Sequence, residues 1–167
     1  MENCPPEKAA RGDEAADRPC DEDVCIDAVV RHNHTLRVPV IDANVTLARG
    51  VFVRGESTMT LDIARWNSVS GWREHFLVMA LGELCFVYED IVADIMKVLA
   101  EASGVSTRCP IREGRYSGSN ARAQLAPLRH FPSLPYGRYR VHTIISGLRS
   151  KRRRACMRVI ADVVPKN

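Results

Sequence analysis

Alternating apolar and polar residues run through much of the chain and predict short β-strands. Met59, Leu61 and Ile63 alternate with more polar or smaller neighbours, which is the period of a strand with one buried face. The same alternation runs from Tyr139 to Ile145, and after a polar turn the chain returns in a segment rich in β-branched residues. The predicted strands are 36–42, 45–54, 57–66, 72–80, a short one near 116, 124–128, 139–145 and 156–163.

One segment has the spacing of a helix instead. Between residues 89 and 102, apolar positions recur at intervals of three and four, and acidic residues lie toward the N-terminal end. Gly104 follows directly after this segment, where a helix commonly ends. Because strands far outnumber this one helix, we expect a mainly β fold, either an antiparallel β-sandwich or an open β-cup. The apolar helix positions are Ile91, Val92, Ile95, Val98 and Leu99.

The charge is unevenly distributed along the 167 residues, which are enough for one domain with a sizeable core. Residues 1–27 hold nine acids and three bases, a net charge of −6, so residues 28–167 carry +10. We expect residues 1–19 to be a disordered acidic tail and residues 20–167 to be the folded domain. The basic body suggests an anionic partner, for which nucleic acid, an acidic membrane and a sialylated or phosphorylated lipid all qualify.

Compartment signals in the sequence point in two directions. No apolar run is long enough to span a bilayer, and Met1 is followed by charges where a secretory leader would need an apolar segment. Yet the chain has six cysteines, which in a small β-fold suggest disulfides and an oxidising compartment. A truncated gene model would reconcile the two, and six reduced thiols in an intracellular protein are the alternative.

Several short motifs occur in a fixed order along the chain. They are Cys20-Asp21-Glu22, Asn44-Val45-Thr46-Leu47, Gly71-Trp72, Leu84-Cys85, Cys109-Pro110 followed by Glu-Gly-Arg-Tyr at 113–116, and Gly-Arg-Tyr-Arg at 137–140. In this order they resemble the MD-2-related lipid-recognition (ML) family, to which the ganglioside GM2 activator belongs. The resemblance covers roughly residues 20–164, and it implies a β-cup around an apolar lipid cavity.

The resemblance also selects among the 15 possible cysteine pairings. It implies the disulfides Cys20–Cys156 and Cys85–Cys109, and the second would also tie the start of the predicted helix to the loop beyond its end. Cys4 and Cys25 then remain; they would pair with each other, or Cys25 would compete with Cys20 for Cys156. Two Asn-x-Thr tripeptides are glycosylation acceptors, Asn33 and Asn44, and Asn44 matches an acceptor of the family.

The lipid-binding residues are expected at a membrane-facing mouth. By resemblance, Val69 and Trp72 correspond to the family's membrane-penetrating loop, and Trp66 and Phe76 flank it; the alternative is that both tryptophans are core residues. The helix face (Ile91, Ile95, Leu99) would line the cavity or merely close the cup. Phe131 and Leu134, beside two prolines, form a second apolar loop near the expected rim.

The basic run at 151–154 has three interpretations. It lies at a predicted hairpin tip, which favours a solvated turn, although contact with anionic lipid headgroups or with nucleic acid would use the same residues. Neither a metal site nor a cofactor site is predicted, because there is no Cys-x-x-Cys pair and the His32–His34 pair has no third neighbour. No catalytic residues are predicted either, because no nucleophile elbow, phosphate loop or paired carboxylates stand out.

The resemblance implies an accessory role. The protein would be secreted or lysosomal, extract a ganglioside-type glycolipid from an anionic membrane, and present it to a lysosomal β-hexosaminidase-type hydrolase as an enzyme activator without chemistry of its own. A secreted lipid- or protein-recognition module in signalling or innate immunity is the first alternative. An intracellular basic nucleic-acid-binding protein is the second.

Overall fold

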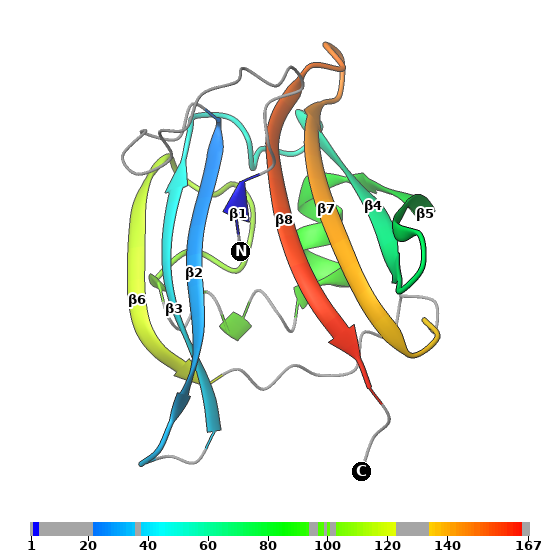
Figure 1. Ribbon diagram of the computed structural model, residues 1–167. Helices are drawn as coiled ribbons and strands as arrows, with labels where there is room; N and C mark the ends of the chain where they lie inside the picture. Colours follow the sequence, from blue (N-terminus) through cyan, green and yellow to red (C-terminus); the bar gives the residue numbers. More distant parts are fainter. Residues whose placement is uncertain are drawn as a thin grey trace, which may run out of the picture.

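The fold is mainly antiparallel β and consists of two sheets, as predicted (Figure 1). The computed structural model describes residues 2–3, 22–35, 38–93, 97–98, 100, 103–122 and 134–164. The larger sheet has the strand order β1-β8-β7-β4-β5, and the smaller has the order β2-β3-β6. The strands are β1 (Glu2–Asn3), β2 (Val24–Asn33), β3 (Val38–Leu47), β4 (Ser57–Asn67), β5 (Gly71–Glu83), β6 (Gly114–Arg122), β7 (Gly137–Gly147) and β8 (Arg153–Val163).

The predicted alternation on β4 and β7 is confirmed by register and burial. Ile63 lies opposite Val141, and Met59 lies opposite Ile145, so the apolar residues of both strands share one face of the sheet. Leu61, Ile63 and Ile145 are buried there. The predicted return strand is also present, since β8 pairs along the length of β7. Of the predicted tail, only residues 2–3 are described, and they pair with β8 as β1.

The two sheets are joined by one apolar cluster at one end of the molecule. Val24 and Leu47 from the smaller sheet share this cluster with Ile145 and Ala155 from the larger sheet, and Leu84 of the helical segment completes it. Burial of each such aliphatic side chain contributes about 1.5–3 kcal/mol. This end of the molecule is therefore closed by close packing.

Elsewhere the apolar faces of the sheets form separate clusters. Ala28, Ile41 and Ala43 form a cluster on the smaller sheet, with Ile26 and Val98 packed against it. A third cluster belongs to the larger sheet and shares no residue with the second: Leu61, Ile63 and Tyr139, with Phe76, Leu77, Met79, Leu81, Leu134, Val141 and Val163. The described residues thus connect the sheets through their core at one end only.

The helical segment begins earlier than predicted. It starts with α1 (Leu84–Phe86) and continues as η1 (Val87–Ile91), so the predicted start at residue 89 is wrong. Glu83 begins it, because its carboxylate accepts a hydrogen bond of 2.8 Å from the backbone N–H of Phe86. η1 ends at Ile91 and Val92 is not helical, which interrupts the predicted helix. Helical residues recur at 93, 97, 98, 100 and 103, one residue past the predicted end at 102, and Gly104 follows with a φ of +71° that favours glycine.

Two further strand predictions need correction. The predicted strands 36–42 and 45–54 are one strand, β3, which ends at Leu47 and is followed by turns over residues 49–56. The apolar pair Val51 and Phe52, which gave this stretch a strand-like composition, is buried from within those turns. β2 was not predicted at all, and the predicted strand 124–128 lies outside the described residues.

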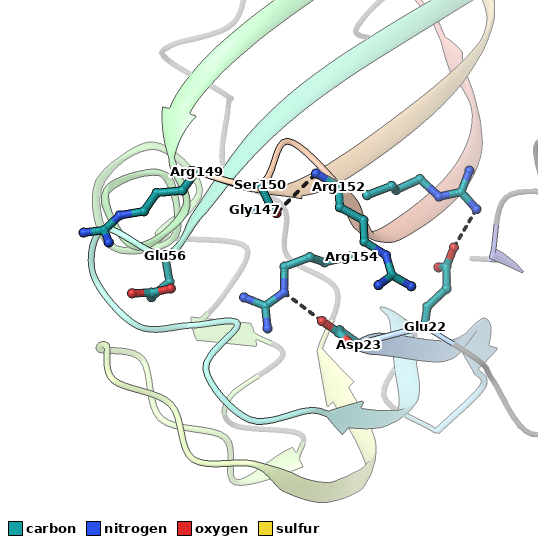
Figure 2. A pocket seen from close by; sticks show the side chains of 9 residues that line it. Glu22, Asp23, Glu56, Gly147, Arg149, Ser150, Arg152 and Arg154 are labelled. Atoms are coloured by element: carbon teal, nitrogen blue, oxygen red, sulfur yellow. Dashed lines mark hydrogen bonds and ion pairs between the residues drawn. The ribbon is translucent and has the colours of Figure 1, made fainter.

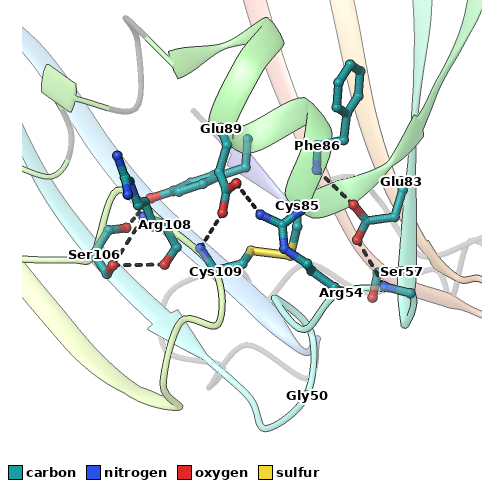
Figure 3. The surroundings of a disulfide bond; sticks show 12 residues. Gly50, Arg54, Ser57, Glu83, Cys85, Phe86, Glu89, Ser106, Arg108 and Cys109 are labelled. Atoms are coloured by element: carbon teal, nitrogen blue, oxygen red, sulfur yellow. Dashed lines mark hydrogen bonds and ion pairs between the residues drawn. A yellow bond between two sulfur atoms is a disulfide. The ribbon is translucent and has the colours of Figure 1, made fainter.

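The predicted disulfide Cys85–Cys109 is present, with its Cα atoms 5.9 Å apart (Figure 3). Beside it, the Glu89 carboxylate accepts a hydrogen bond of 2.7 Å from the Cys109 N–H and pairs with Arg54. These contacts, led by the Cys109 N–H, lower the pKa of Glu89. Cys25 and Cys156 each take part in a disulfide as well. The pairing Cys20–Cys156 stays a prediction, since Cys20 lies outside the described residues.

We expect the C85A/C109A double variant to lose about 3 kcal/mol of unfolding free energy, because the disulfide closes a loop of 24 residues. Urea unfolding under non-reducing conditions measures this. Thr107→Ala, an exposed change in the same loop, is the control and should stay within about 0.5 kcal/mol of the parent chain. A double variant as stable as the parent chain would contradict the structural role given to this bond.

Candidate functional site

The tip of the β4–β5 hairpin presents an apolar side chain to solvent. The Asn67 Oδ1 atom accepts hydrogen bonds from the backbone N–H groups of Val69 (2.8 Å) and Ser70 (3.2 Å). Gly71 then turns the chain with a φ of +77°, a conformation that glycine adopts without strain. Val69 is 94% exposed at this tip, so its apolar surface is presented by a hydrogen-bonded turn.

Both tryptophans stand directly behind this tip. Trp66 and Trp72 are opposite each other across β4 and β5, and their rings meet edge to face with centroids 5.2 Å apart. Trp66 is 45% exposed and Trp72 is half-buried, so neither is among the buried core residues. The Arg140 guanidinium lies 4.8 Å from the centre of the Trp72 ring, a cation–π contact.

Phe76 connects the tip to the apolar cluster of the larger sheet. Its ring lies 6.1 Å from that of Tyr139, which is buried in this cluster. The guanidinium groups of Arg65 and Arg73 lie 5.6 and 5.8 Å from the centre of the Phe76 ring. Leu134 packs against the same cluster, so Phe76 and Leu134, two predicted site residues, share one apolar region.

Exposed apolar groups gather at this end of the larger sheet. The pairing of Asn67 with Gly71 and of Gly137 with Val163 places the hairpin tip, the start of β7 and the end of β8 at the same end. The exposed apolar side chains here are Trp66, Val69, Tyr136 and Val164. We call these four residues the apolar rim.

The inner face of the larger sheet is only partly covered. On adjacent strands, Val141 and Val159 are opposite each other, as are Leu61 and Met79. Leu61 is buried, but Met79 on the edge strand β5, Val141 on β7 and Val159 on β8 are only half-buried. In a filled sandwich these positions would be in close contact with the facing sheet.

The remaining predicted site residues have mixed outcomes. Ile91 is half-buried at the end of η1, whereas Ile95, Leu99 and Phe131 lie outside the described residues. Asn44 is exposed in the middle of β3, opposite Ser117 of β6, where an acceptor side chain is accessible. The Asn33 Oδ1 atom accepts a hydrogen bond of 3.0 Å from the Thr35 N–H.

A charged group on the outer face of the larger sheet was not predicted. The Arg140 guanidinium pairs with Glu74, and His75 Nδ1 lies 2.8 Å from an Asp62 carboxylate oxygen. His142 lies opposite Asp62 on β4 and Arg158 on β8. Burial, followed by the neighbouring Arg140 charge, lowers the pKa of His142. The polar positions that alternate with the core residues of β7 were the available signal.

His142 should make the folded state less stable in acid. Because its folded pKa lies below the usual value near 6.5, the unfolded chain binds more protons as the pH falls through that value, and stability is lost. The facing groups are Arg140, Arg158, Asp62 and Glu74. We expect H142Q to lose less unfolding free energy than the parent between pH 7.5 and pH 5.0, measured by urea unfolding; equal losses would contradict this.

The basic run 151–154 lies at the opposite end of the larger sheet and is partly structural. Arg154 Nε lies 2.7 Å from the Asp23 carboxylate, and its Nη1 atom donates to Ser57 Oγ (3.2 Å). The same guanidinium donates to the backbone carbonyls of Gly50 (3.0 Å) and Arg49 (3.2 Å). Arg153 pairs with Glu22 at 2.8 Å. Arg153 and Arg154, two residues of the basic run, therefore both make ion pairs that stabilise the fold.

We expect Arg154→Met to lower the unfolding free energy by about 2–3 kcal/mol, because it leaves several partly buried acceptors without their donor. Arg152→Met is the matched control at an exposed position two residues away and should change stability by less than about 0.5 kcal/mol. Thermal and urea unfolding of both variants measure the difference. Equal effects of the two substitutions would show that Arg154 has no special structural role.

No protein-family model matches this sequence, and no curated protein is significantly similar to it. Among the described residues, no three His, Cys, Asp or Glu side chains are grouped as metal ligands would be. Within the same part of the chain, no helix has the length and apolar character needed to cross a bilayer.

Proposed function

We propose that this protein binds and transfers a lipid, holding the acyl chains between its two sheets. The observation that carries this proposal is the division of the core: the sheets share one cluster at the closed end, and each has its own apolar face beyond it. Acyl chains placed there would cover Met79, Val141 and Val159. Each buried CH₂ group of a lipid contributes about 0.8 kcal/mol, so two chains would bind strongly.

The apolar rim would contact the membrane. Val69 at the tip would enter the bilayer first, and Trp66 would lie at the boundary, where tryptophan is favoured because it has an apolar body and a polar N–H. Arg65 and Arg73, which stack on Phe76 just behind the tip, would then meet the headgroups. Basic residues at this level favour an anionic membrane by roughly 1 kcal/mol each.

The full role that we propose is that of an activator. The protein would lift a ganglioside-type glycolipid out of the membrane and present its sugar to a lysosomal β-hexosaminidase-type glycosidase, leaving the chemistry to that enzyme. Secretory or lysosomal localisation fits the Cys85–Cys109 disulfide, since such bonds persist mainly in oxidising compartments. The order of the cysteine and tyrosine motifs, which resembles that of the ML family, supports this role.

Val69→Glu is the sharpest test of membrane contact. The 94% exposure of Val69 means that the substitution should leave the fold intact, while a carboxylate at the tip should reduce extraction of a fluorescent ganglioside from anionic vesicles about tenfold. Val53→Glu is the matched control: Val53 is exposed in the turns at the closed end, so this variant should extract lipid as the parent does.

Equal extraction by the parent and the Val69→Glu variant would refute the role of the tip. An absence of extraction by the parent would refute the lipid-transfer function itself. Hydrolysis of vesicle-held ganglioside by purified β-hexosaminidase separates an activator from a recognition module. Only an activator raises the rate.

A further inference from the structure

A basic pocket of about 440 Å³ lies at the β7–β8 turn. This turn is the orange loop at the top of Figure 1, and Figure 2 shows the pocket from close by. Its walls come from three places: the β7–β8 turn, the segment that leads into β2, and the residue just before β4. The lining residues are Glu22, Asp23, Glu56, Gly147, Arg149, Ser150, Arg152, Arg153 and Arg154.

The four arginines of the pocket fall into two pairs with different roles. Arg153 and Arg154 are neutralised by Glu22 and Asp23, as described above, and form part of the fold. Arg149 and Arg152 are exposed, and neither makes an ion pair with a described residue. Their charge is countered in the lining only by Glu56, whose side chain makes no ion pair within the described part of the chain.

The turn that carries these two arginines is held in place by hydrogen bonds. The Gly147 N–H donates to the Arg152 carbonyl and the Lys151 N–H donates to the Gly147 carbonyl, both at 2.9 Å. Ser150 Oγ accepts from the Arg152 N–H at 3.3 Å, so the hydroxyl hydrogen of Ser150 is left to donate to another group. The turn therefore carries two exposed guanidinium groups and a hydroxyl, and the Arg149 side chain extends toward Glu56, away from Arg152 (Figure 2).

We propose that this pocket binds a sulfate or phosphate ester group. The planar guanidinium fork of arginine matches the oxygens of these anions, and charge-assisted bonds of this kind are among the strongest hydrogen bonds in proteins. Arg152 would donate to the ester oxygens, and the exposed Arg149 side chain would swing round the turn to join it. Ser150 would be a third donor, and Lys151 would add positive charge nearby. A volume of 440 Å³ is in the range of pockets for small ligands, which suits an anionic sugar.

The location of the pocket separates this proposal from the lipid function. The 11 residues of β4 lie between the hairpin tip and the basic turn, which corresponds to a separation on the order of 30 Å. A headgroup of the membrane that the apolar rim contacts would therefore not reach the pocket. The anion would come instead from solution, as a sugar phosphate or as part of a sulfated glycan.

Isothermal titration calorimetry of the full chain with two probes tests the proposal. Glucose 6-phosphate represents a phosphate ester and a sulfated heparin disaccharide represents a sulfate ester. We expect at least one of them to bind saturably, and we expect R149Q/R152Q to raise its Kd at least tenfold. The control R115Q/R122Q removes the same charge from two exposed positions of β6 and should leave that Kd within twofold.

The outcomes are distinguishable. Phosphate binding alone, sulfate binding alone, or both, each lost in R149Q/R152Q, would support the site and identify the source of the anion. Equal weakening in both double variants would mean that net charge alone attracts the probes, and would overturn the site. No binding of either probe by the parent chain at 50 mM salt would overturn it as well. Thermal unfolding confirms that the variants are folded, and ganglioside extraction is scored separately.

Discussion

The two sheets are held together at one end, and the arrangement of the rest of the molecule depends on that contact. Val24 of the smaller sheet, Ile145 of the larger sheet and Leu84 of the helical segment meet there in a single cluster. Beyond this cluster each sheet keeps an apolar inner face of its own. The central residues of both clusters are buried, but Met79, Val141 and Val159 on the larger sheet are only half-buried. Covering apolar surface of this kind is favourable, and this is the physical reason for proposing an apolar ligand between the sheets.

Polar and covalent links reinforce the same end. Arg154 of β8 bonds to Asp23 before β2 and to the turn after β3, so one side chain connects both sheets. The Cys85–Cys109 disulfide fixes the start of the helical segment beside it, with Glu89 bonded to the Cys109 N–H. Packing, ion pairs and a disulfide therefore all stabilise the same end of the molecule.

The parts of the fold that follow from local periodicity were predictable from the sequence. Apolar and polar residues alternate over Met59–Ile63 on β4 and Tyr139–Ile145 on β7, and the register confirms the faces inferred for Leu61, Ile63 and Ile145. β8 was predicted from its β-branched residues and its position after a polar turn. The start of the helical segment was not predictable in this way, because the apolar run from residue 84 to 87 has no clear period and its cap is a glutamate. The Cys85–Cys109 bond came from resemblance, supported by its position around the helix.

The grouping of residues at the hairpin tip was predictable from the sequence, whereas contacts between distant parts of the chain were not. Val69, Trp66 and Trp72 are close in sequence, so a hairpin brings them together. His142 lies opposite Asp62, and Arg154 pairs with Asp23, so these contacts join residues about 80 to 130 positions apart in the sequence. A local sequence pattern cannot predict such contacts. Interpreting 151–154 as one basic run also hid the difference between Arg152, which is exposed, and Arg154, which is bonded.

Strands β4 and β7 run without a break from the hairpin tip to the basic turn, which makes the larger sheet a spacer of fixed length. Its length, on the order of 30 Å, is several times the Debye length of about 8 Å at physiological ionic strength. Charges at one end therefore have almost no effect on binding at the other. Substitutions at the two ends should then combine additively, and a molecule docked through its tip would keep its arginine-lined end in open solution, accessible to a second ligand.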